Sequence, residues 1–173
     1  MNSQQLNTLL SNLTLEQVRA EKYRRSLREF TKAAWPTIEP GVDYQNNWHL
    51  DAISEHLQAV VEGDIRHLII NVPPRHSKSI SVAVALPAWT WARDPAKKFL
   101  YASYASSLSI RDGTKCRRLI DSPWYQNHFG DKFKLTDDQN QKQRFENDKS
   151  GYRISTSVGG ALTGDGGDII CID

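Results

Sequence analysis

The stretch HLIINVPPRHSKSISVAVALPAW, residues 67–89, decides the fold that the sequence predicts. Its apolar start, residues 67–72, is of strand type, and a helical pattern resumes at Lys78 after the loop PPRHSKS, residues 73–79, called the Lys78 loop below. A Lys-Ser pair that opens a helix directly after a buried strand is typical of a phosphate-binding loop, because the helix N-terminus offers unpaired N–H groups to an anion. In such a loop Lys78 would reach the β- and γ-phosphates of a nucleotide, and the Ser79 hydroxyl would bind Mg²⁺.

A second strand-like run, DIICID, occupies residues 168–173. An apolar strand that ends in a carboxylate has the Walker B pattern, in which the acid holds Mg²⁺ through its water shell. Structural strands often have the same pattern, so it gains weight only in combination with the Lys78 loop. Because both motifs must reach one Mg²⁺, we expect the strands 68–72 and 168–173 to be adjacent and parallel at the sheet centre, with Lys78 close to Asp173.

Local patterns elsewhere predict helices and strands in alternation. Thr14 and Gln17 have capping-box spacing in a helical region over residues 1–35, which is expected to stop at Trp35-Pro36. One face of that region would be formed by Val18, Tyr23, Leu27, Phe30 and Ala34. Further helices are expected at 50–61 (ended by Gly63), 78–91 (kinked at Pro87) and 106–120, and further strands at 98–103 and 152–157. This order predicts an α/β fold with a mainly parallel sheet and helices on both faces.

The composition restricts the class of protein. The chain has 22 Lys+Arg against 20 Asp+Glu and a formal net charge of +2, without the strong basic excess of a dedicated DNA-binding module. Its apolar runs are too short for a membrane span, and its first 17 residues lack the basic and apolar regions of a signal peptide. Cys116 and Cys171 have no metal-binding spacing, and we expect both to be buried and reduced.

Several short motifs occur in an order that is more specific than any one of them. They are W-H at 48–49, LIINVPPRHSKS at 68–79, PAW at 87–89, SYASSLS at 103–109 and VGGALTGDGGDIICID at 158–173. Together they resemble the ATPase domain of the large terminase subunit family of tailed bacteriophages, over residues 44–173.

The resemblance implies an ASCE-type P-loop NTPase fold, preceded by an N-terminal helical arm at 1–43 and incomplete at its C-terminus. It further implies ATP and Mg²⁺ as cofactors and ATP hydrolysis coupled to the packaging of viral DNA into a procapsid. The implied partners are double-stranded viral DNA, the portal, the small terminase subunit and further copies in a homo-oligomeric ring. The implied location is the host cytoplasm, without a membrane.

The resemblance also implies roles for individual residues. The expected catalytic residues are Arg75, Lys78 and Asp173, and the expected metal ligands are Ser79 and Asp173. The expected nucleotide-binding residues are Trp48, His49, Pro74, Arg75, His76, Ser77, Lys78 and Ser79. Trp48 and His49 would lie near the adenine, although an aromatic pair that opens a helix is equally typical of core packing.

Three features depart from the family pattern. Ser77 replaces the glycine before the lysine, where a Cβ crowds phosphate and disfavours a positive φ. Asp165 stands where relatives often have an arginine that stabilises the transition state. The sequence also stops at Asp173, one residue before the acid that would position the attacking water. These departures predict a chain that hydrolyses ATP poorly or not at all, even if it binds nucleotide.

Three functional interpretations remain open from the sequence. The chain is a packaging ATPase, a non-hydrolysing nucleotide-binding or assembly module of the same family, or a helicase-like ATPase outside packaging. The motifs PPRHSKS at 73–79 and VGGALTGDG at 158–166 disfavour the helicase-like ATPase. A basic group on the helix at 106–120 would either be solvated or contact DNA phosphates or a neighbouring subunit; it comprises Arg111, Lys115, Arg117 and Arg118.

Overall fold

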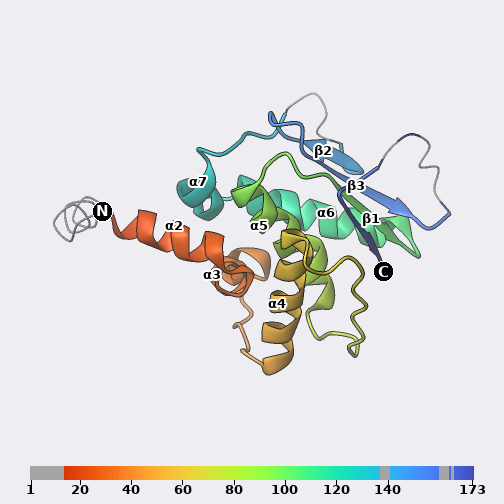
Figure 1. Ribbon diagram of the computed structural model, residues 1–173, viewed down its shortest axis with the longest axis horizontal. Helices are drawn as coiled ribbons and strands as arrows, with labels where there is room; N and C mark the ends of the chain where they lie inside the picture. The colour runs from red at the N-terminus through yellow and green to blue at the C-terminus, as the bar shows by residue number, and fades with distance from the viewer. Residues whose placement is uncertain (1–13, 137–140, 160–163, 165) are drawn as a thin grey trace.

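The protein is represented by a computed structural model that describes residues 14–136, 141–159, 164 and 166–173 (Figure 1). Its helical elements are α2 (Leu15–Arg25), α3 (Leu27–Ile38), α4 (Trp48–Glu62), the π-helix η1 (Ile80–Ala85), α5 (Leu86–Arg93), α6 (Ser106–Asp121) and α7 (Pro123–Phe129). Its strands are β1 (Phe99–Ser103), β2 (Arg144–Glu146), β3 (Tyr152–Ser157) and β4 (Ile169–Ile172). The predicted α/β class is confirmed at this level.

The four strands form one open sheet in the order β2-β3-β1-β4. β1 runs parallel to both of its neighbours, so that Tyr101 lies opposite Ser155 on β3 and Cys171 on β4. β2 is antiparallel to β3, so the sheet is mixed and only partly parallel. β4 pairs with β1 alone and therefore forms one edge of the described sheet.

The expected pairing of residues 68–72 with the C-terminal strand is wrong. Residues 67–72 are extended but belong to no described strand, and β4 pairs instead with β1. Burial along the segment still alternates, since Leu68 and Ile70 pack against the core while Ile69 is exposed. A period-2 pattern records which side chains are buried, but a strand also needs a neighbour for its backbone hydrogen bonds. Here no described strand supplies that neighbour.

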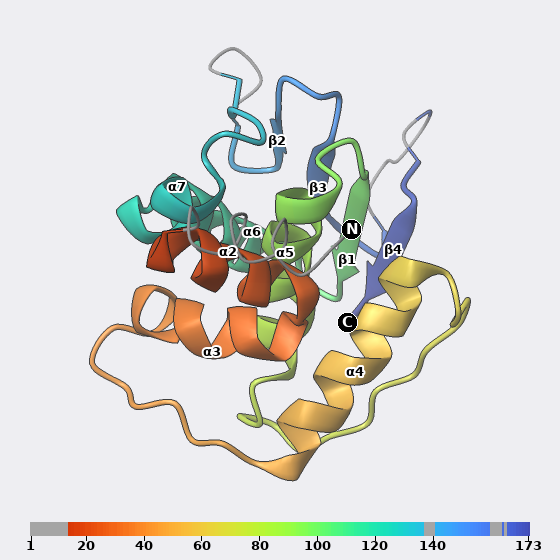
Figure 2. The same cartoon turned by 60° about the vertical axis from the view of Figure 1, so that its left-hand side comes forward.

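The helices gather on one side of the sheet in both ribbon views (Figures 1 and 2). Hydrogen bonds fix this packing: the Tyr101 hydroxyl on β1 donates to the Val82 carbonyl of η1 at 2.8 Å, and the Ser109 hydroxyl of α6 donates to the Tyr101 carbonyl at 2.9 Å. The expectation of helices on both faces is therefore not met by the described residues. Among the described elements, α6 packs directly on β1 and β3, and α3 and α4 pack on η1.

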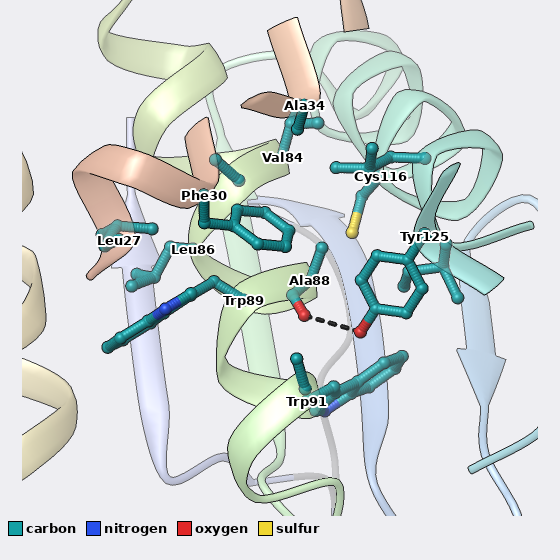
Figure 3. Packing of buried hydrophobic residues seen from close by; sticks show 14 of the residues in the cluster. Leu27, Phe30, Ala34, Val84, Leu86, Ala88, Trp89, Trp91, Cys116 and Tyr125 are labelled. Carbon is teal, nitrogen blue, oxygen red and sulfur yellow. Dashed lines mark hydrogen bonds between the residues drawn. The ribbon is translucent and has the colours of Figure 1, made fainter. Parts of the chain in front are cut away.

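Aromatic side chains fill the core, both among the helices and between the helices and the sheet (Figure 3). Trp89 and Trp91 of α5 are fully buried, and the Tyr125 hydroxyl of α7 donates to the Ala88 carbonyl at 2.8 Å. Phe30 of α3 belongs to the same cluster and is fully buried. The core therefore includes residues on both sides of the boundary that the sequence suggested at residue 43.

The N-terminal helical region has a break that the sequence pattern did not predict. The capping box at Thr14 and Gln17 is present, but the backbone is extended at Ser26, whose hydroxyl caps α3 by accepting the Glu29 N–H at 3.2 Å. Val18 is exposed as a result, because α2 and α3 do not present one continuous face. The helix also continues through Pro36 to Ile38. A proline in the last turn removes only one hydrogen bond, so the helix does not have to stop there.

The helix that follows the Lys78 loop changes its winding before Pro87. Residues 80–85 form the π-helix η1, and the Leu86 N–H donates to the Ser81 carbonyl five residues earlier. Pro87 has no N–H and its ring crowds the preceding turn, which favours the wider π geometry there. The predicted irregularity at Pro87 thus takes the form of a π segment. The predicted end of α4 at Gly63 is confirmed, with a left-handed φ of 91°.

Candidate functional site

Three of the predicted site residues meet at one end of the sheet. The Lys78 ammonium forms an ion pair with one carboxylate oxygen of Asp173, and the Ser79 hydroxyl lies 3.4 Å from the other. Lys78 and Asp173 are 95 residues apart in the sequence. The expectation that Lys78 and Asp173 lie close together is confirmed, although residues 67–72 form no described strand and do not pair with β4.

Backbone hydrogen bonds place Asp173 at this position. Its N–H donates to the Ala102 carbonyl at 2.9 Å, and its carbonyl accepts the Tyr104 N–H at 3.2 Å. These bonds extend the β1–β4 pairing to the carboxyl ends of both strands. Lys78 lies in a different element, the first turn of the helix that continues as η1. In that turn the Ser81 N–H donates to the Ser77 carbonyl at 3.0 Å. The carboxyl ends of parallel strands are where α/β sheets commonly bind ligands.

The Lys78 loop has two left-handed residues. Arg75 has a φ of 66° and Ser77 a φ of 60°, while His76 between them does not. Loops that alternate in this way turn backbone N–H groups toward a common concavity, which suits an anion. The Ser77 conformation agrees with the expectation that this position favours glycine. His76 is held within the loop, with its Nδ1 3.0 Å from the Pro74 carbonyl.

Of the two residues expected near the adenine, His49 lies beside this loop and Trp48 contacts His49. The rings of His49 and His76 are 5.6 Å apart between centroids, and those of Trp48 and His49 are 6.3 Å apart. Trp48 is 79% exposed, so it is not a core residue. The structure thus brings His49 to the Lys78 loop and leaves the Trp48 indole open to solvent.

Lys78, Ser79 and Asp173 line a cavity of about 760 Å³, called the Lys78 cavity below. One wall is the extended segment with Ile65, Leu68 and Ile70, and the opposite wall is β4. Trp48, His49, Arg75 and His76 are not among its lining residues. The cavity therefore reaches Lys78, Ser79 and Asp173, but it does not extend to His49 and His76.

Two charged residues of this cavity were not predicted as site residues. Arg111 and Asp112, on the second turn of α6, line it together with Lys78 and Asp173. The pKa of Arg111 is raised, first by its hydrogen bond to Asp112 and more weakly by the charges of Asp173 and Glu39. A signal was available, because α6 follows β1 directly and its first turns must lie at the carboxyl end of the sheet. Sequence reasoning placed Arg111 with the other basic residues of the helix instead.

The described residues place two possible oxygen ligands for a metal ion, Ser79 and Asp173, close together. In the described part of the chain no group of three His, Cys, Asp or Glu side chains is arranged to hold an ion. The Ser79 hydroxyl lies 3.4 Å from an oxygen of the Asp173 carboxylate. Asp165, the acid predicted to replace an arginine, lies outside the described residues.

The two cysteines differ in exposure but share a low reactivity. Cys116 is fully buried and Cys171 is partly buried, and both are free thiols. Burial raises the pKa of the Cys116 thiol to about 12 and that of Cys171 to about 11. A thiol whose pKa is raised in this way is mostly protonated near neutral pH and is a poor nucleophile.

Comparison of the chain with protein-family models, with curated proteins and with solved structures finds no match. None of the helices in the described ranges has the length and apolar character that crossing a membrane requires.

Proposed function

We propose that the chain binds ATP with Mg²⁺ at the Lys78 loop as the ATPase domain of a phage DNA-packaging motor related to the large terminase subunits. The observation that supports this most is the contact of Lys78 and Ser79, at the start of a helix, with Asp173, at the end of a parallel strand. A lysine and a hydroxyl at a helix N-terminus, opposite a strand-terminal acid, are the groups a P-loop site uses. The motif series in the sequence adds the packaging context.

The side chains of Lys78, Ser79 and Asp173 have the chemical groups that Mg²⁺ and the phosphates of ATP require. Mg²⁺ prefers oxygen ligands and is commonly held by one or two protein oxygens together with substrate phosphates. Ser79 and Asp173 would supply those oxygens. The ion would neutralise phosphate charge, and Lys78, now paired with Asp173, would be released to the β- and γ-phosphates. The left-handed residues of the loop would add backbone N–H donors.

A second candidate is a non-hydrolysing nucleotide-binding module of the same family. Ser77 favours it, because its Cβ is held at a φ of 60° at the position where relatives have glycine. Release of inorganic phosphate from Mg-ATP, measured on the chain and on its Lys78→Ala variant, separates the two candidates. Turnover that depends on Lys78 supports the motor, and Lys78-dependent binding without turnover supports the non-hydrolysing module.

Lys78→Ala is expected to weaken ATP binding by about 1.5–3 kcal/mol, the range for a charge-assisted hydrogen bond, which corresponds to roughly tenfold to a hundredfold in affinity. Titration calorimetry with Mg-ATP measures the change. Lys149→Ala is the matched control, because Lys149 pairs with its neighbour Asp148 at 3.2 Å and is not part of the Lys78 cavity. Equal affinities for the wild type and the Lys78 variant would show that the loop is not the nucleotide site.

A further inference from the structure

The wall of the Lys78 cavity formed by α6 carries its own cation. Arg111 lines the cavity with Lys78 and Asp173, and its side chain is 56% exposed, so that a ligand in the cavity can reach it. The guanidinium lies in the field of Asp173, whose charge contributes to its raised pKa after the larger effect of Asp112. Lys78, Arg111 and Asp173 therefore line one cavity from three different parts of the chain.

Asp112 fixes the direction of this guanidinium. Arg111 donates its Nε–H to the Asp112 carboxylate at 2.8 Å, and the Asp112 side chain is only 10% exposed. A hydrogen bond at Nε leaves the donors of the two Nη nitrogens for another acceptor. Guanidinium groups bind carboxylate and phosphate oxygens with such paired donors.

The start of α6 is held firmly against the sheet. The Ser109 hydroxyl donates to the Tyr101 carbonyl of β1 at 2.9 Å, and the Ser155 hydroxyl of β3 donates to the Ser109 carbonyl at 3.1 Å. Arg111 lies two residues further along the same helix. Its backbone position relative to the carboxyl end of β1 and β4 is therefore set before any ligand binds.

We propose that Arg111, oriented by Asp112, binds the terminal phosphate of a nucleoside triphosphate in this site. The inference rests on the proposed nucleotide site and adds a residue to it. Because Arg111 lines the same cavity as Lys78, it would meet the phosphate that lies beyond the one held at the Lys78 loop. A diphosphate lacks the group that would reach Arg111. The residue thus gives the site a preference for triphosphate over diphosphate.

The test compares the affinities of Mg-ATP and Mg-ADP by titration calorimetry in the wild type and five variants. Arg111→Ala should lower ATP affinity about tenfold to a hundredfold and ADP affinity much less, since one charge-assisted contact is lost only with the triphosphate. Arg118→Ala is the matched control, because Arg118 is an exposed arginine of the same helix and is not among the residues that line the cavity. Lys78→Ala should lower both affinities.

Asp112→Asn tests the positioning role. It should reduce the ratio of ATP to ADP affinity in the same direction as Arg111→Ala, but less, while thermal melting shows that the fold is kept. Arg111→Lys should restore only part of the ratio, because an ammonium does not present paired donors.

The outcomes separate the inference from the function on which it rests. Lys78-dependent ATP binding with an unchanged ATP-to-ADP ratio in Arg111→Ala overturns the inference alone. Loss of double-stranded DNA binding in Arg111→Ala, with nucleotide affinities unchanged, overturns it in favour of a DNA contact. Absence of any Lys78-dependent nucleotide binding overturns both.

Discussion

Ser77 shows how one side chain sets the properties of the Lys78 loop. Its φ of 60° lies in the left-handed region, where a Cβ approaches the following carbonyl and costs about 1–2 kcal/mol. Glycine avoids this cost but loses about 0.5–1 kcal/mol through the greater freedom of the unfolded chain. The first effect is the larger, and the loop is therefore under conformational strain with serine.

Ser77→Gly is expected to raise the free energy of unfolding by up to about 1.5 kcal/mol, the largest difference between these two effects. It is also expected to tighten ATP binding, because it removes a Cβ at the proposed phosphate position. Urea denaturation and calorimetry with Mg-ATP measure the two quantities. Ser77→Ala keeps the Cβ and removes the hydroxyl, so it should give neither gain. A gain in Ser77→Ala equal to that in Ser77→Gly would mean that the hydroxyl, and not the backbone, is the source of the strain.

At the scale of elements, a buried arginine joins α6 and η1 to the sheet. Arg153 of β3 is fully buried; its guanidinium lies 4.2 Å from the centroid of the Tyr101 ring, and it donates to the Ser155 hydroxyl and the Ala83 carbonyl. A buried cation needs such partners to offset its lost hydration. Gly113 makes room for it on α6, because a Cβ built at Gly113 would collide with the guanidinium.

Gly113→Ala should lower the free energy of unfolding by about 1–3 kcal/mol, the usual cost of overpacking a core. Helix propensity alone predicts the opposite sign, since alanine is better than glycine in a helix by about 1 kcal/mol. Chemical denaturation decides between them. Gly159→Ala is the control, because no atom of the described residues lies within 4 Å of a Cβ built there. A stabilised Gly113→Ala variant would show that Arg153 can move at little cost.

At the scale of the whole molecule, the described sheet ends in an apolar edge. β4 has β1 as its one neighbour, and its side chains alternate, so that Ile169 and Cys171 pack against the core while Ile170 and Ile172 are 59% and 77% exposed. The Lys78 cavity separates this edge from the extended segment at 65–70. An exposed edge strand with apolar side chains is a template for pairing with another chain.

The chain is therefore expected to self-associate through β4 as its concentration rises. Ile170→Lys should reduce this association, because a charge on an edge strand opposes strand pairing. Ile170 also lines the Lys78 cavity, so nucleotide affinity is measured alongside. Analytical ultracentrifugation over a range of concentrations measures the effect. Val158→Lys serves as control, since Val158 is 69% exposed but lies outside β4. Equal association of the wild type and Ile170→Lys would exclude β4 as the contact.

The sequence by itself determined the elements whose signals are local. Three such elements depend only on neighbouring residues, and the structure has each of them. They are the capping box at Thr14, the left-handed end of α4 at Gly63 and the strand at 152–157. The proximity of Lys78 and Asp173 was also predictable, because both motifs were assigned to the carboxyl ends of strands in one sheet.

Only the tertiary structure decided which strands pair and what surrounds Lys78. The residues at 67–72 have a strand pattern but no strand neighbour, and β4 lies at the edge of the sheet beside β1. Alternation in sequence records which side chains are buried, whereas pairing depends on hydrogen-bonding partners many residues away. Arg111 reaches the site for a similar reason. The hydrogen bond to Asp112 and the packing of α6 on β1 set the direction of the Arg111 side chain. The pattern of charges along the helix sequence does not reveal either of these contacts.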